Sequence, residues 1–236
     1  MFSSKRSKFA AAGIAAIVIG GGSYGIVAAT TGSGTATTTA SNYPFAHDGT
    51  GSGSGSNART GPEPGGSTGT VTSVSSSGFT FTTSGGQKVT VNETSTTSYK
   101  RGTSPASASA VTTGESVLVL GMVDSTTITA TEVIAQPPST DATSPGGQVI
   151  PYTQGKQGSS QQVGTIPSDY SQGTGTIVSG TTADKATEAA LAVYPGGVVD
   201  RVVALGNGDY EVHYIGVNWP HHIFVNQDFQ VIGANS

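Results

Sequence analysis

Two long stretches rich in Gly, Ser and Thr most constrain what this chain can fold into. Residues 32–66 and 137–172 show no apolar periodicity, and their composition is typical of flexible linkers. Only 10% of the 236 residues are charged and 7% are aromatic. Such a chain has too few large apolar side chains to offset the entropy of ordering one large globule. The sequence therefore predicts two small folded segments, 67–136 and 173–236, separated by linkers.

A long uncharged run follows three basic residues near the N-terminus. Lys5, Arg6 and Lys8 precede residues 9–31, which as a helix would reach about 35 Å, enough to cross a bilayer. The basic flank is expected to stay in the cytoplasm, so the remaining chain would lie outside. A cleaved signal peptide with small residues at 27–29 is the alternative. Both interpretations predict export, either as a membrane protein with an extracytoplasmic C-terminal part or as a secreted protein.

Composition excludes several classes of function. The chain has no Cys, which excludes disulfides, thiolate nucleophiles and Cys-ligated metal. Beyond the basic N-terminus, the chain has seven basic and 14 acidic side chains. A negative exported part makes nucleic acid an unfavourable partner, because binding to phosphates requires a positive surface.

The segment 67–136 has the pattern of a small β-rich domain. Short runs rich in β-branched and aromatic residues are separated by Gly and Ser turns, as expected of successive strands. These runs lie at 69–74, 78–83, 87–91, 116–123 and 126–134. Closing such a sheet hides its edges, so we expect an all-β barrel of OB-like or Greek-key type. Its basic residues are Lys88, Lys100 and Arg101, too few for the basic groove of a nucleic-acid-binding OB-fold.

The segment 173–236 has the pattern of an α+β domain. Residues 181–194 place small apolar side chains on one helical face, a Thr is expected to cap the helix, and Pro195 follows it. Four strands are expected after the helix, at 198–205, 209–215, 221–226 and 229–233. One helix packed on a four-stranded antiparallel sheet satisfies this pattern.

Both segments resemble known families. The runs GTVTSV, GFTFTT and QKVTV, followed by Gly114-Glu115-Ser116-Val117, resemble the β-rich bacterial domain of unknown function 5666. The C-terminal segment resembles a PepSY domain, the module found beside certain secreted metallopeptidase propeptides and in many envelope proteins. The residues that carry this second resemblance are Tyr194–Gly197, Val199–Val202, Tyr210–His213 and Val225–Val231. The PepSY resemblance implies an inhibitory or scaffolding module rather than an enzyme.

The chemically suggestive residues lie close together in the last third of the chain. His213, His221 and His222 fall on or beside one expected hairpin. If His221 and His222 are both in the strand they must point to opposite faces, so at most two histidines would share a face. Zinc sites need three or four protein ligands, so we predict no metal, cofactor or catalytic residue. We interpret these histidines as polar surface groups and as weak partner contacts.

Trp219 is the single Trp of the chain and lies beside the histidine pair. It is either an exposed anchor for a partner, as Trp often is at interface hot spots, or a side chain folded back over a small core.

The sequence as a whole predicts an exported, non-enzymatic envelope protein. Its PepSY-like module is expected to bind an envelope protein or peptide, with a role in restraining an extracellular peptidase. An open sheet edge would accept an extended peptide. The alternative is a passive spacer that spans the cell wall. An enzyme is not expected, because no candidate base has an identifiable nucleophile or oxyanion partner.

Overall fold

The computed structural model describes residues 57–137, 161–217 and 219–236. The expected membrane or signal segment at 9–31, residues 32–56 of the first expected linker and residues 138–160 of the second lie outside the described residues. Within the described ranges the protein is mostly β with a single α-helix, and no helix there is long and apolar enough to cross a bilayer.

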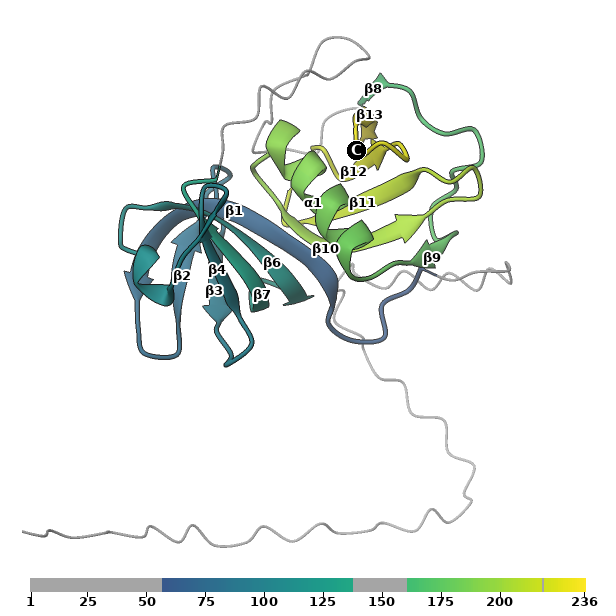
Figure 1. The fold of residues 1–236 in the computed structure, drawn as a ribbon. Helices are drawn as coiled ribbons and strands as arrows, with labels where there is room; N and C mark the ends of the chain where they lie inside the picture. Colours follow the sequence, from purple (N-terminus) through teal and green to yellow (C-terminus); the bar gives the residue numbers. More distant parts are fainter. Residues whose placement is uncertain (1–56, 138–160, 218) are drawn as a thin grey trace, which may run out of the picture. The chain divides into compact units, whose positions relative to one another are not determined.

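Five strands close a barrel in the N-terminal half of the described chain (Figure 1). They are β1 (Glu63–Val74), β2 (Gly78–Thr82), β3 (Lys88–Asn92), β6 (Ser116–Asp124) and β7 (Thr127–Ala135). Around the ring the order is β1, β2, β3, β7, β6 and back to β1, with β3 and β7 parallel and all other neighbours antiparallel. The expected set of five strands is thereby confirmed. The short elements β4 (Ser98–Arg101), β5 (Ser104–Pro105) and the 3-10 turn η1 (Ala108–Ala110) follow β3.

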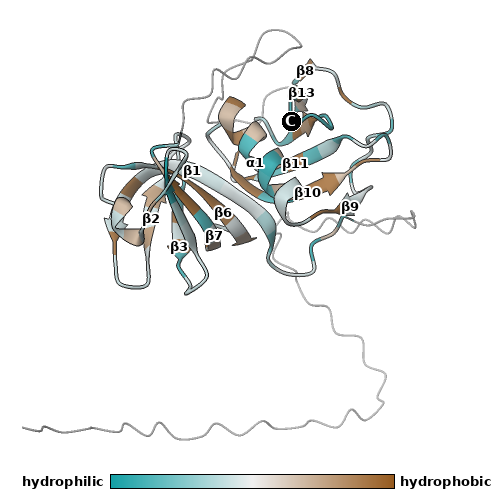
Figure 2. Cartoon of the chain, in the orientation of Figure 1, coloured by the Kyte–Doolittle hydropathy of each residue, from teal (hydrophilic) through white to brown (hydrophobic). Residues whose placement is uncertain are grey.

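The barrel core comes from the alternation visible in the sequence. Phe79 and Phe81 of β2 are buried, as are Val89 and Val91 of β3, while the Thr between each pair is not. Strand β6 is apolar on both faces and appears brown in Figure 2. Its odd-numbered valines face the barrel core, and its leucines face the apolar cluster around the helix. Two buried faces explain why this strand has no polar alternation.

The C-terminal half packs one helix on an antiparallel sheet. Its elements are β8 (Gln162–Gly164), β9 (Thr176–Ile177), α1 (Thr181–Val193), β10 (Val198–Ala204), β11 (Tyr210–Ile215), β12 (His222–Val225) and β13 (Val231–Asn235). Small residues of α1, such as Ala186 and Ala190, are fully buried and share a cluster with Val212 and Tyr214 of β11. The N-cap is Gly180, with φ of 65° and no side-chain hydrogen bond, so the expected Thr cap is wrong. A glycine serves here because this backbone conformation is left-handed.

The two halves are joined through β1, which differs from the expectation of two segments isolated by a linker. Strand β1 begins at Glu63 rather than near 67, and its residues Gly66 and Ser67 pair with β10 as well as with β6. A Cβ at Gly65 would lie 2.1 Å from the carbonyl oxygen of Val199, so glycine is needed for this close approach. The described residues of both halves consequently belong to one compact unit.

Two short strands, one of them in the expected linker 137–172, pair with the edges of the C-terminal sheet. Strand β8 pairs with β13, and β9 pairs with β10. The open edge that we expected to accept a peptide is therefore occupied by the chain itself. Natural sheets commonly protect their edges in this way, because unpaired backbone groups recruit other strands.

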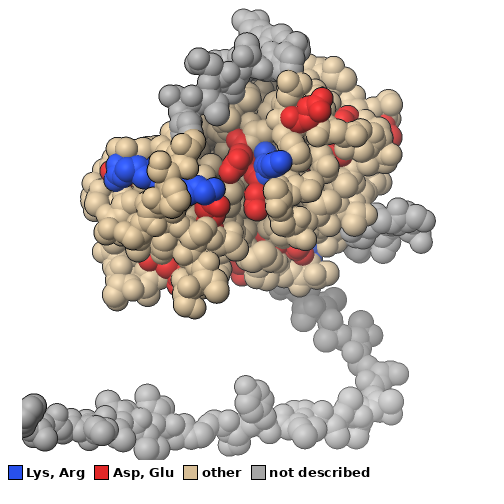
Figure 3. Space-filling view, in the orientation of Figure 1, with Lys and Arg blue, Asp and Glu red and all other residues tan. Residues whose placement is uncertain are grey.

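Glu188 of α1 provides a test of this packing. It lines a cavity of about 600 Å³ together with Lys100 and Leu191, and acidic side chains lie close to basic ones on the face drawn in Figure 3. Burial and the nearby charge of Glu132 raise the pKa of Glu188, although Lys100 opposes them. The Glu188 carboxyl therefore keeps its proton in the folded chain at a pH where it has lost the proton in the unfolded chain. At neutral pH the ionised Glu188 accordingly lowers the free energy of unfolding.

We accordingly expect Glu188→Gln to raise the free energy of unfolding by roughly 0.5 kcal/mol at pH 8, a value kept small because the side chain is only partly buried. The gain should shrink at pH 5, since protonation of Glu188 already favours the fold there. Urea midpoints of the two proteins at both pH values measure it. Asp228→Asn removes an exposed carboxylate as a control, and an equal gain there would contradict the explanation.

Candidate functional site

Two histidines face each other on adjacent strands of the C-terminal sheet. His213 of β11 and His222 of β12 are register partners in the antiparallel ladder. Alternation places both, together with Glu211, on the sheet face opposite α1, because Val212 and Tyr214 face the helix. His213 is 8% exposed and His222 is 4% exposed. The expectation of polar surface histidines is therefore wrong for this pair.

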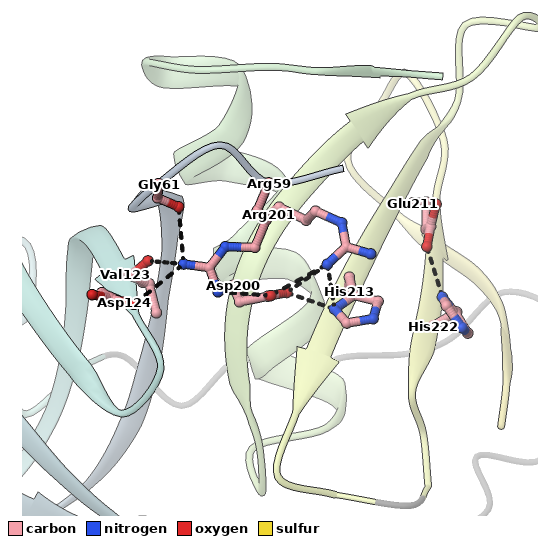
Figure 4. Close-up of polar contacts among 9 residues, drawn as sticks. All are labelled: Arg59, Gly61, Val123, Asp124, Asp200, Arg201, Glu211, His213 and His222. Atoms are coloured by element: carbon pink, nitrogen blue, oxygen red, sulfur yellow. Dashed lines mark hydrogen bonds and ion pairs between the residues drawn. The ribbon is translucent and has the colours of Figure 1, made fainter. Parts of the chain in front are cut away.

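His213 is held by a buried carboxylate. Its Nδ1 lies 2.5 Å from Oδ1 of Asp200, and Nη1 of Arg201 approaches the same nitrogen to 3.0 Å (Figure 4). The short contact to a carboxylate assigns the proton to Nδ1, which donates to Asp200 and so cannot also accept from Arg201. This tautomer leaves Nε2 of His213 as the nitrogen with a lone pair.

His222 has the same arrangement with a second carboxylate. Its Nδ1 lies 2.6 Å from Oε1 of Glu211, whose side chain is 1% exposed. The other oxygen, Oε2, is buried and finds no hydrogen-bond partner within the described ranges. The ring of Tyr170 lies beside His222, with its centroid 5.8 Å from that of the imidazole. Burial and the charge of Glu211 raise the pKa of Tyr170, although Arg201 opposes them, so the phenol stays protonated.

His221 completes the cluster, contrary to the alternation argument. It lies just before β12, where its backbone N–H donates to Asn235 and its carbonyl accepts from Tyr214. Because His221 is outside the strand, its side chain is not forced to the face opposite His222. Its ring centroid lies 4.5 Å from that of His213 and 4.7 Å from that of His222. One ring nitrogen from each of the three histidines lies within 4.8 Å of the others.

The charges around the cluster keep two groups in defined states. Burial alone would raise the pKa of Asp200, but the hydrogen bond and charge of His213, followed by the charges of Arg201 and Arg59, hold that pKa below its usual value. Burial, followed by His213 and His222, lowers the pKa of His221 to about 4, despite a backbone hydrogen bond with Val217 and the charge of Asp200. At neutral pH Asp200 is therefore a carboxylate and His221 a neutral imidazole.

Asp200 also connects the cluster to the chain preceding β1. Arg59 places Nη1 3.3 Å from Oδ2 of Asp200, and its Nη2 donates to the carbonyl oxygens of Val123, at 2.7 Å, and Gly61, at 3.1 Å (Figure 4). The Asp200 carboxylate thus contacts Arg59, Arg201 and His213.

Trp219, the other suggested contact residue, lies elsewhere. It is 3% exposed and belongs to the apolar cluster around α1, where its ring meets that of Tyr194 edge to face at 6.5 Å. Of the two interpretations of this Trp, the structure favours the side chain folded over the core.

Sequence reasoning missed the residues that support the histidines. Glu211 was detectable, because it stands two residues before His213 in the same strand and so shares its face. Asp200 was not, because a register irregularity between Val199 and Arg201 alters which face the carboxylate reaches. Tyr170 lies in a stretch whose composition indicated linker.

Comparisons with protein-family models, with curated proteins and with solved structures find no match. The site must therefore be judged on its chemistry. Three convergent imidazoles, two of them oriented by buried carboxylates, form a set of nitrogen donors. Such a set is suited to binding an electron-pair acceptor rather than to attacking a substrate.

Proposed function

We propose that this protein is an exported, non-enzymatic envelope protein whose C-terminal α+β part is a binding module, with its ligand held at the histidine cluster. The observation that carries the proposal is a group of ionisable side chains gathered on one side of a small sheet. His213, His222 and two carboxylates are buried there, and His221 and Arg201 beside them are partly buried. Buried charged pairs contribute little net stability compared with apolar packing. Ionisable groups whose pKa values are shifted, as those of Asp200 and His221 are here, concentrate at functional sites.

The export part of the proposal is supported by the sequence. The uncharged run at 9–31 follows three basic residues, and the remainder of the chain is poor in charge. Residues 9–31 hold the protein in the cytoplasmic membrane, or are removed to release it. N-terminal mass analysis of protein from cells distinguishes these outcomes, because an intact Met1 species in membranes indicates an anchor and a start near Thr30 indicates secretion. A C-terminal half that resists protease on whole spheroplasts but is digested once they are lysed contradicts export.

Two finer features of the fold belong to the same proposal. The ring order β1, β2, β3, β7, β6, with its parallel β3·β7 pair, supports an OB-like barrel. The helix followed by four antiparallel strands supports the PepSY-like assignment of residues 173–236. On this view the barrel and the α+β part are two domains that share β1. An envelope protein or peptide would reach the module at the histidine face, since the sheet edges are occupied by β8 and β9.

Native mass spectrometry of protein recovered from the envelope of expressing cells tests the binding role without assuming a ligand. We expect the intact protein to carry a non-covalent mass that disappears on denaturation. That mass should be absent from the His213→Gln/His222→Gln variant and retained by His47→Ala, which changes the one histidine of the sequence outside the cluster.

Two results contradict the proposal. One is wild-type protein that carries no bound mass. The other is a bound mass that persists in the double variant while circular dichroism shows that the variant is folded. A passive spacer predicts the first result, because its histidine cluster would have no ligand.

A further inference from the structure

The histidine cluster has the donor geometry of a metal centre. Each of the three rings offers one nitrogen, and these nitrogens lie within 4.8 Å of one another. Imidazole nitrogens bind zinc at about 2.0–2.1 Å, so ligands around one ion are separated by less than about 4.2 Å. Side-chain movements of about 1 Å, within the range of ordinary rotamer adjustment, would bring the three nitrogens onto one ion.

Each ring is already oriented by a second partner. Nδ1 of His213 donates to Asp200 and Nδ1 of His222 donates to Glu211. His221 has a hydrogen bond with the backbone of Val217. Histidines that bind metals usually give their other ring N–H to a carboxylate or a backbone carbonyl, which fixes the tautomer and makes the ligating nitrogen more basic. With Nε2 of His213 and of His222 as the ligating nitrogens, two carboxylate–histidine pairs and one backbone–histidine pair satisfy this requirement.

From this geometry we infer that His213, His221 and His222 bind a divalent late transition-metal ion such as Zn²⁺. The inference rests on the proposed binding function and names its ligand. Imidazole nitrogens suit Zn²⁺ and its neighbours in the first transition row, whereas Mg²⁺ and Ca²⁺ require oxygen ligands. Three protein ligands leave a fourth position of a tetrahedral ion for water or for a donor atom from a partner.

The charges around the cluster accommodate such an ion. Arg201 is the cation closest to the ring of His213, but its guanidinium is bound to Asp200, as is that of Arg59. Neither of these two arginines forms an ion pair with Glu211. The buried Oε2 of Glu211 has no hydrogen-bond partner among the described residues. This carboxylate supplies negative charge directly behind His222. His221 is partly exposed, which gives an ion access from solvent.

Calorimetric titration of the purified full-length protein with Zn²⁺ tests the inference. We expect one saturable equivalent per chain, and Co²⁺ should bind with the visible absorption of a low-coordinate nitrogen site. His221→Gln is the most informative single change, because His221 lies outside the strands and its loss should not disturb the sheet. It should weaken Zn²⁺ binding at least 100-fold, and Glu211→Gln, which acts through His222, about 10- to 100-fold.

The controls use residues outside the cluster. His47→Ala should leave Zn²⁺ affinity unchanged, and Ca²⁺ at the same concentration should not bind. No saturable Zn²⁺ binding by the folded wild-type protein overturns the inference, as does affinity that is unchanged in folded His221→Gln.

The two proposals can fail separately. Protein from the envelope could carry a peptide or another organic ligand whose binding requires the histidine cluster, while purified protein does not bind Zn²⁺. In that case the module binds a ligand but the metal inference is wrong. If neither a bound mass nor Zn²⁺ is found, both fail.

Discussion

Replacement of Asp200 with Ala is expected to lower the free energy of unfolding by about 3–5 kcal/mol. The Asp200 side chain is 3% exposed, and its two oxygens contact His213, Arg201 and Arg59. Removing the carboxylate leaves two guanidinium groups with no compensating charge at this position, and breaking a buried pair from one side is costly for that reason. It also releases the contact between β10 and the chain preceding β1. Urea denaturation of the full-length protein, followed by circular dichroism at neutral pH, measures the loss.

A matched control is available in Asp124, which also approaches Arg59. Its carboxylate lies 3.9 Å from Nη2 of Arg59 and is 71% exposed, so Asp124→Ala should change stability by less than about 0.5 kcal/mol. Adding Arg59→Met to Asp200→Ala should recover part of the loss, because it removes one uncompensated charge. Equal effects of Asp200→Ala and Asp124→Ala would show that the buried network does not stabilise the fold.

The elements of this protein could be predicted because their signals are local. Alternation of Phe or Val with Thr in β2 and β3 fixes which face of each strand is buried. The doubly apolar run Val117–Leu120 requires burial on both faces, and β6 has it. The helix follows from small apolar residues at helical spacing and ends before Pro195. Each of these patterns depends on residues within about ten positions of one another.

What could not be predicted depends on contacts between distant residues. Pairing of β1 with β10 joins positions more than 130 residues apart, such as Gly66 and Val199. Residues 161–172 have the composition of a linker, yet β8 in this stretch pairs with the sheet because its edge groups need partners. The third histidine was misjudged for the same kind of reason. Whether His221 begins β12 or precedes it decides its direction, and the composition does not locate strand ends to one residue.

Replacement of Trp219 with Ala is also expected to lower the free energy of unfolding by about 3–5 kcal/mol, the usual cost of removing a large buried ring. The side chain is 3% exposed and packs against Tyr194 in the cluster that joins α1 to the sheet. Its removal leaves a cavity that the short, alanine-rich face of α1 cannot fill. Far-UV circular dichroism in urea measures the loss, because the variant has no Trp to report by fluorescence.

This experiment also separates the two interpretations of Trp219. If Trp219 were a surface anchor for a partner, Trp219→Ala would lower the free energy of unfolding by less than about 0.5 kcal/mol. The same small loss is expected for Val74→Ala, because that side chain is 50% exposed. A core residue gives a graded series in which Trp219→Phe, which keeps an aromatic ring near Tyr194, loses less than Trp219→Ala. Emission from wild-type Trp219 should accordingly lie at the short wavelengths of a buried indole and shift on unfolding. If Trp219→Ala is as stable as the Val74→Ala control, the ring does not contribute to the core.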